Sequence, residues 1–85
     1  MEVQIVSVDK SYPAFSSVCV RCGNRELQAI IYNHTIKIHI DRSGHRANMA
    51  GQSFASAGEA MEHYQHPATK AMIHAAVLQH LEEDV

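Results

Sequence analysis

Three short segments of alternating polar and apolar residues, separated by pairs of turn-forming residues, constrain this chain more than any other feature. The segments cover residues 16–22, 25–32 and 35–40. The pairs between them, Gly23-Asn24 and Asn33-His34, contain residues that tolerate the positive φ of tight hairpin turns. Runs of this length and spacing predict consecutive antiparallel strands joined by two-residue turns.

Two-residue turns also predict the register of these strands. They place Cys22 opposite Arg25 and Tyr32 opposite Thr35. Counting back along the strands gives a set of apolar pairs: Val20 with Leu27, Val18 with Ala29, Leu27 with Ile40, Ala29 with Ile38, and Ile31 with Ile36. Because side chains alternate across a strand, the opposite face carries Cys19, Arg21, Glu26, Gln28, Ile30, Tyr32, Lys37 and His39. We therefore expect one buried apolar face and one face of mixed polarity.

The two ends of the meander are less strongly constrained. An earlier strand, residues 3–8, is expected to join the sheet, and its change of phase at Val6 indicates either a β-bulge or burial on both faces. Residues 41–44 are expected to form a turn. Residues 45–52 then form either a fifth, edge strand or a loop, and the sequence does not decide between them.

Two helices are expected after the sheet. Ser56 and Glu59 form a capping box that begins the first helix, with an apolar stripe of Ala57, Ala60, Met61 and Tyr64. Pro67 suits the first turn of a second helix, which runs to about Glu83. The chain is thus predicted to be a single small α+β domain, residues 1–85: an antiparallel β-meander of four strands, or five, with two C-terminal α-helices packed on one face.

The second helix carries two apolar stripes on roughly opposite sides. One stripe comprises Ala68, Ala71, Met72, Ala75 and Leu78, and the other comprises Ile73, Val77 and Leu81. Because one sheet cannot cover both stripes, either the first helix packs on the second stripe or another chain does. In the latter case Ile73, Val77 and Leu81 would form the interface of a homodimer through the C-terminal helix.

Composition bounds the classes of function. The chain has 85 residues, 46% of them hydrophobic, and a formal net charge of −2, as expected of one small globular domain. No apolar run approaches the roughly 20 residues of a membrane span, and the start of the sequence has no basic leader with an apolar core. Two cysteines are too few for the disulfide framework of a secreted miniprotein, so a cytoplasmic location is expected.

The spacing of Cys19, Cys22, His34 and His39 approaches that of a two-Cys, two-His zinc finger. The predicted register argues against a metal site, because Cys19 and Cys22 point to opposite faces and His39 lies two strands, roughly 10 Å, from Cys19. Cys19 likewise has no base within reach for nucleophilic catalysis. The sequence contains no glycine-rich phosphate loop, G-x-S-x-G elbow or H-E-x-x-H pair. We therefore expect neither an enzyme nor a cofactor.

Binding of a macromolecule is the remaining expectation. A protein partner would contact the exposed sheet face, whose mixed aromatic and cationic residues are typical of interface hot spots. The predicted contact residues are Arg21, Ile30, Tyr32, Lys37, His39, Arg42 and Arg46. Small domains without catalytic groups are frequently accessory or inhibitory proteins, such as those of phages and other mobile elements. This pattern favours a non-enzymatic module that docks on a larger protein through the sheet face or the last helix.

Nucleic-acid binding is the alternative. Residues 10–50 carry six of the seven Lys and Arg side chains but only two of the nine Asp and Glu side chains. Tyr32 is, however, the one aromatic residue predicted on the exposed sheet face, and sheet-based RNA binders stack two or three bases on aromatic side chains. A protein partner is therefore the preferred prediction, and a membrane partner is not expected.

Overall fold

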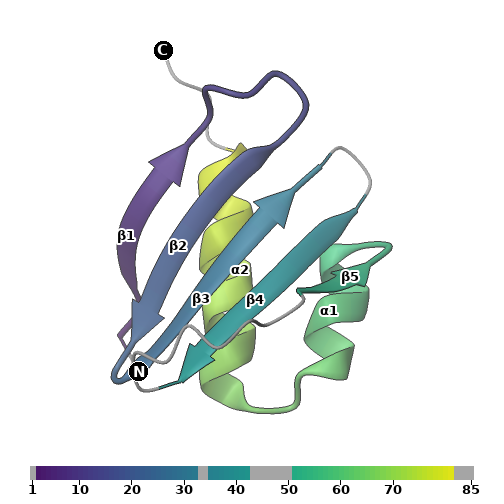
Figure 1. Ribbon diagram of the computed structural model, residues 1–85. Coiled ribbons are helices and arrows are strands. Elements are labelled where there is room, and N and C mark those ends of the chain that lie inside the picture. The colour runs from purple at the N-terminus through teal and green to yellow at the C-terminus, as the bar shows by residue number, and fades with distance from the viewer. Residues whose placement is uncertain (1, 33–34, 43–50, 82–85) are drawn as a thin grey trace.

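The computed structural model describes residues 2–32, 35–42 and 51–81, with Asp41 and Arg42 described by their backbone alone. These residues form an antiparallel five-stranded sheet followed by two helices. The strands are β1 (Gln4–Asp9), β2 (Ser16–Cys22), β3 (Arg25–Ile31), β4 (Ile36–Arg42) and β5 (Gln52–Phe54), and they lie in sequence order across the sheet (Figure 1). The predicted α+β meander with C-terminal helices is confirmed.

The register of the three central strands is the predicted one. Cys22 pairs with Arg25, and every apolar pair expected from the two-residue turns is present between β2 and β3 and between β3 and β4. Gly23 has a φ of 64°, the left-handed conformation that a primed hairpin turn requires. The amide of Tyr32 donates to the carbonyl of Thr35 over 2.8 Å, as expected for the second hairpin. Asn33 and His34, the expected turn residues of that hairpin, lie outside the described residues.

The phase change at Val6 corresponds to a bulge. Ile5 pairs with Val20 and Ser7 with Cys19, so β1 has one more residue than β2 over this stretch. Since paired residues share a face, Ile5 and Val8 both point to the same side as Val18 and Val20, although three positions separate them. Of the two alternatives, the bulge is therefore correct.

A fifth, edge strand is present, and it begins at the last residue of the window, 45–52, that was left open between a strand and a loop. β5 covers three residues, and its Phe54, Ser53 and Gln52 pair with residues of β4. Residues 43–50, which include most of the stretch left open between a strand and a loop, lie outside the described residues.

Both helices begin where the sequence places them. α1 (Ala57–His63) is capped by Ser56, whose Oγ accepts a hydrogen bond from the Glu59 amide over 3.2 Å. The Glu59 carboxylate accepts from the amide of Ala55, one residue before the Ser56 amide that it would bind in a standard capping box. α2 (Pro67–Leu81) begins at the proline, where the missing N–H leaves no hydrogen bond unmade. The residues expected to extend α2 to about Glu83 are not among those described.

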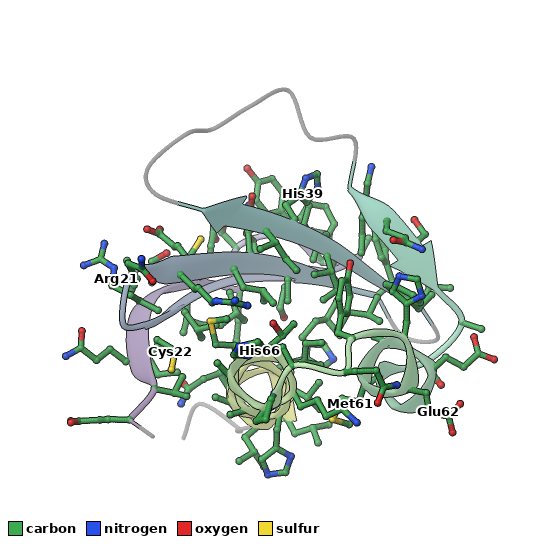
Figure 2. The ribbon with its side chains drawn as sticks, turned by 90° about the horizontal axis from the view of Figure 1, so that it is seen from below. Arg21, Cys22, His39, Met61, Glu62 and His66 are labelled. Atoms are coloured by element: carbon green, nitrogen blue, oxygen red, sulfur yellow. The ribbon has the colours of Figure 1, made fainter. Side chains whose placement is uncertain are left out.

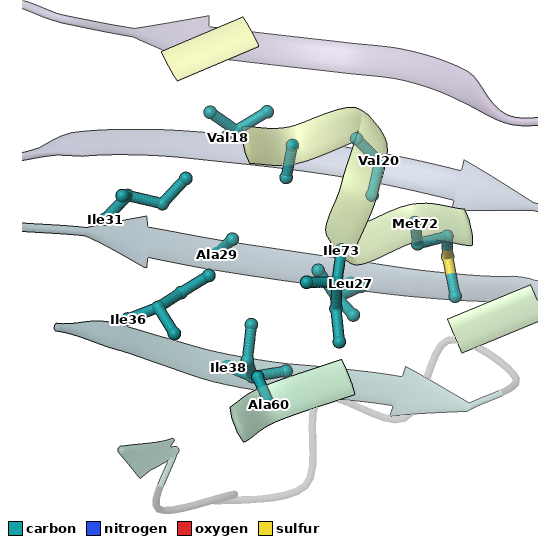
Figure 3. Packing of buried hydrophobic residues seen from close by; sticks show 11 residues of the cluster. Val18, Val20, Leu27, Ala29, Ile31, Ile36, Ile38, Ala60, Met72 and Ile73 are labelled. Atoms are coloured by element: carbon teal, nitrogen blue, oxygen red, sulfur yellow. The ribbon is translucent and has the colours of Figure 1, made fainter. Parts of the chain in front are cut away.

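Both helices cover the same side of the sheet, and the core lies between the helices and the sheet. α2 lies against β2 and β3, α1 lies beside β4 and β5, and β1 stands to one side of α2 (Figure 1). Figure 3 shows the apolar face of the strands meeting Ala60 of α1 and Met72 and Ile73 of α2. The buried apolar residues are Val18, Val20, Leu27, Ala29, Ile31, Ile36, Ile38, Ala60, Ala68, Met72, Ile73 and Ala76. The predicted buried face is thus the one that the helices cover.

The two stripes assigned to α2 require correction. Ile73 is completely buried against the sheet, so it offers no surface to a second chain and cannot belong to an oligomer interface. Leu78 lies on the solvent side instead of on the buried stripe, with 49% of its surface exposed. The buried side of the helix comprises Ala68, Thr69, Met72, Ile73 and Ala76. Residues from both expected stripes face the sheet because the buried arc runs between the two.

Neither α1 nor α2 has the length and hydrophobicity of a transmembrane helix.

Candidate partner-binding surface

The sheet face turned away from the helices, here called the outer face, carries most of the predicted contact residues. Figure 2 shows His39 on this side of the sheet and Cys22 on the side of the helices. No described helix covers the outer face, because both pack on the opposite side.

One end of the outer face is occupied by an ion pair. Nη2 of Arg21 lies 3.3 Å from Oε2 of Glu26, and these residues lie opposite each other on β2 and β3. The Arg21 side chain is half exposed, so the pair is well screened by water. A partner that contacts Arg21 also meets the neighbouring carboxylate.

Polar groups occupy the middle of the outer face. Nε2 of Gln28 donates to Oγ of Ser17 over 3.0 Å, and Gln28 lies between Cys19 on β2 and His39 on β4. The ring of His39 lies against Gly51, so closely that a Cβ at Gly51 would overlap it. The His39 ring therefore lies beside the residue that precedes β5.

The other end of the outer face carries an aromatic cluster of three residues, Tyr12, Phe15 and Tyr32. The rings of Tyr12 and Phe15 are stacked with centroids 4.6 Å apart, and those of Phe15 and Tyr32 are tilted with centroids 5.4 Å apart. Tyr12 and Tyr32 are 51% and 39% exposed. The expectation that Tyr32 is the one aromatic residue on this face is therefore wrong.

The sequence contained a signal for Phe15. Ser16 pairs with Ile31 on the buried face, so the preceding residue, Phe15, falls opposite Tyr32 on the outer face. Tyr12 belongs to the connection between β1 and β2, and no strand pattern predicts its position. Ile30 and Lys37, both half-buried and paired across β3 and β4, lie next to the cluster.

A hollow of about 380 Å³ opens beside the aromatic cluster. Its walls come from the end of β3, the start of β4, the residues that lead into α1 and the last two turns of α2. The lining residues are Ile31, Tyr32, Thr35, Ile36, Ala55, Ser56, Ala57, Val77, His80 and Leu81. Tyr32 thus belongs both to the aromatic cluster and to the hollow. Val77 and Leu81, predicted for a separate interface on the last helix, line the same hollow as Tyr32.

Two other interactions hold the elements around these sites. At the end of α2, Nδ1 of His80 lies 2.9 Å from Oγ of Ser16, which is buried at the start of β2. At α1, the ring of Tyr64 packs edge-on to that of Phe54 from β5. Burial raises the pKa of the Tyr64 phenol above its ordinary value of 10.0.

The cationic character of the outer face is weaker than residues 10–50 indicate. Arg25 pairs with Cys22, so alternation places it on the side of the helices. Arg46 lies outside the described residues, as does the side chain of Arg42, whose backbone pairs with Arg25. Among the described side chains of the outer face, Arg21 and Lys37 are accompanied by the acidic Glu26 and Asp9.

The residues of the zinc-finger-like spacing are not brought together. Cys19 lies on the outer face, Cys22 on the side of the helices, and Gln28 separates Cys19 from His39, as the register implies. Both cysteines are free and half-buried, and His34 is not among the described residues. In the described part of the chain, no three His, Cys, Asp or Glu side chains are grouped as metal ligands would be.

No protein-family model, no curated protein and no solved structure matches this chain.

Proposed function

We propose that this chain is a non-enzymatic protein-binding module, which docks on a larger protein through the aromatic cluster and the hollow beside it. The observation that carries the proposal is the position of Tyr32. Tyr32 contacts the Phe15 ring on the outer face and also lines the hollow. The aromatic cluster and the hollow therefore form one contiguous surface. Interface hot spots combine these two features, since a partner's side chain is best desolvated in a pocket flanked by large rings.

The chemistry around Tyr32 supports a protein as the partner. Tyrosine rings provide large contact areas with little loss of conformational entropy, and the stacked Tyr12 and Phe15 rings restrict each other further. Val77 and Leu81 add apolar surface, and Ile30 and Lys37 lie at the edge of the cluster. An apolar centre with a mixed rim is typical of a specific protein interface.

A domain of this size acts most simply by covering a site on its partner. We therefore propose an accessory or inhibitory role, of the kind found in proteins of phages and other mobile elements. Two free cysteines fit a reducing compartment, and the cytoplasm is the proposed location.

Binding of single-stranded nucleic acid is the second candidate, because three aromatic rings at one end of a sheet can stack bases. The described charges support it less well than they support a protein. Arg21 is already paired with Glu26, and Lys37 shares the outer face with Asp9. Nucleic-acid binders instead gather unpaired basic side chains on one face.

Affinity capture from lysate of the source organism, with and without nuclease, tests the two candidates. We expect a stoichiometric protein partner that survives nuclease. Tyr12→Ala should weaken its binding at least about tenfold, since aromatic hot spots contribute about 2 kcal/mol or more. Tyr12 lies outside the core, so the variant should keep the wild-type circular dichroism spectrum.

Arg21→Ala is the matched control, because Arg21 lies on the same face at the opposite end of the sheet. The proposal predicts that this variant binds the partner about as tightly as wild type. If Arg21→Ala abolishes capture while Tyr12→Ala does not, the partner binds the polar end of the outer face. If capture collapses on nuclease treatment, the nucleic-acid candidate replaces the proposal.

A further inference from the structure

β1 forms one edge of the sheet. Among the described strands its neighbour is β2 alone, so the other side of its backbone faces outward. β1 is six residues long and exposed along its whole length, whereas the strand at the opposite edge, β5, has three residues. A long exposed edge is a template for pairing with another strand.

β1 also carries apolar side chains that the helices do not cover. Ile5 and Val8 point to the helix side of the sheet, opposite Val20 and Val18, but they are 40% and 39% exposed. The reason is visible in Figure 1, where α2 runs behind β2 and β3 and leaves β1 to one side. The apolar surface on the helix side of the sheet therefore extends beyond α2 to the edge formed by β1.

The bulge makes the arrangement of faces along β1 self-complementary. Gln4 and Asp9 point outward with Arg21 and Ser17, and Ile5 and Val8 point inward. Gln4 and Asp9, at the two ends of the strand, thus lie on the outer face, and Ile5 and Val8, next to them, lie on the helix side. The bulged pair Val6-Ser7 is at the centre, so the order of faces is the same from either end of the strand. A bulge commonly protects an edge from pairing. Here it places Ile5 and Val8 on one face, which a regular strand would not do for residues three apart.

We propose that β1 pairs antiparallel with β1 of a second copy of this chain, about a two-fold axis that passes between Val6 and Ser7. In this register Ile5 of each copy lies opposite Val8 of the other, and Gln4 lies opposite Asp9 on the outer face. The axis is perpendicular to the sheet, so the helices of both copies lie on the same side. Ile5 and Val8 of the two copies then form one continuous apolar surface on the helix side of the joined sheet, between the two α2 helices.

A second copy fits this edge better than an unrelated strand does. It presents the same inward and outward order and an equally uncovered apolar surface, and such isologous contacts are the commonest route to closed dimers. Growth beyond two copies is limited, since β5 offers three residues for pairing. Burial of four additional apolar side chains also supplements the small core of a chain of 85 residues.

Sedimentation equilibrium over a range of concentrations tests the proposal. The wild-type chain should reach twice its sequence mass at high micromolar concentration. Val8→Lys places a charge inside the joined edge and should raise the dimer dissociation constant at least tenfold. Leu78→Lys is the matched control, because Leu78 is comparably exposed, at 49%, but lies on the solvent side of α2, and it should leave the dissociation constant within about twofold.

A wild-type chain that stays monomeric at every concentration overturns the proposal. So does a dimer that Leu78→Lys dissociates as strongly as Val8→Lys does, since the interface would then be α2. If Val8→Lys fails to fold, a mixed sample of differently isotope-labelled wild-type chains decides the question by NMR. Contacts between the methyl groups of Ile5 in one copy and Val8 in the other support the proposed register, and their absence in the dimer refutes it.

Discussion

Nδ1 of His80 lies 2.9 Å from Oγ of Ser16, and this contact joins the last turn of α2 to the first residue of β2. Ser16 is buried, and His80 is one of the residues that line the hollow. The hydrogen bond therefore positions the helix end that carries Val77 and Leu81. Loss of this hydrogen bond should therefore change the shape of the hollow as well as lower the stability of the fold.

The coupling between Ser16 and His80 is measurable in a double-mutant cycle. We expect Ser16→Ala and His80→Ala each to lower the free energy of unfolding by about 1 kcal/mol, because each leaves the other partner unsatisfied. The double variant should lose clearly less than the sum, since the second change removes a bond that is already gone. Urea unfolding followed by circular dichroism gives all four values. Additive losses would mean that the two side chains do not interact in solution.

Leu27 and Ile30 test the assignment of the two faces of the sheet. Leu27 is fully buried beneath the helices, whereas Ile30, three positions along β3, lies half-buried on the outer face. Leu27→Ala should lower the free energy of unfolding by about 2–5 kcal/mol, because it leaves a cavity in a packed core. Ile30→Ala should lower it by much less. A larger loss for Ile30→Ala than for Leu27→Ala in denaturant unfolding would show that the two faces are exchanged, as a register displaced by one residue requires.

Gly23 and Gly58 should respond in opposite ways to the same substitution. Gly23 has a φ of 64°, so Gly23→Ala strains the backbone and should lower the free energy of unfolding by about 1–2 kcal/mol. Gly58 lies in α1, where a Cβ would meet no atom closer than 3.7 Å. Gly58→Ala should raise the free energy of unfolding by about 0.5–1 kcal/mol through helix propensity. Thermal unfolding of the two variants gives both signs, and a stabilising Gly23→Ala would contradict the hairpin assignment.

The carboxyl of Asp9 should titrate below its ordinary value. The Ser11 hydroxyl donates to Oδ1, and the Ser11 amide donates to the same oxygen over 2.9 Å, so the pKa of Asp9 is lowered from 3.8. A lowered pKa in the folded state means that the ionised carboxylate stabilises the fold above pH 3.8. This contribution is lost as the pH falls through the folded pKa.

Ser11→Ala removes the larger of these two causes. The pKa of Asp9 should then rise toward 3.8 while staying below it, since the backbone amide still donates. An NMR titration that follows the side-chain carboxyl carbon measures the value directly. Ser7→Ala, at an exposed position of β1, the strand that ends with Asp9, serves as the control and should leave the titration of Asp9 unchanged.

The sheet was predictable because its determinants are local. A two-residue turn at Gly23-Asn24 leaves one register available, and the alternation of Val18, Val20 and Leu27 selects one buried face. The capping box at Ser56 and Glu59 and the helix-starting Pro67 act within a single turn. In each case the residues that decide the conformation lie within a few positions of one another.

The faces of α2 were not predictable in the same way. Periodicity shows that the helix has apolar residues on two sides, but the sheet selects an arc between them, so Ile73 is buried while Leu78 is exposed. That choice depends on where α1 and the sheet contact the helix. The aromatic cluster depended on tertiary structure for the same reason, because Tyr12 reaches Phe15 through a connection without a repeating pattern.

The order of the strands also has a consequence for how the chain folds. Each strand pairs with the one before it in sequence, so the sheet can assemble by successive closure of short loops, beginning at the Gly23-Asn24 turn. Docking of α2 instead requires the chain to close between Ser16 and His80. During synthesis on the ribosome, the apolar face of the sheet is thus complete before the helix that covers it has been made. The nascent meander is the stage at which this protein is most exposed to aggregation and to capture by chaperones.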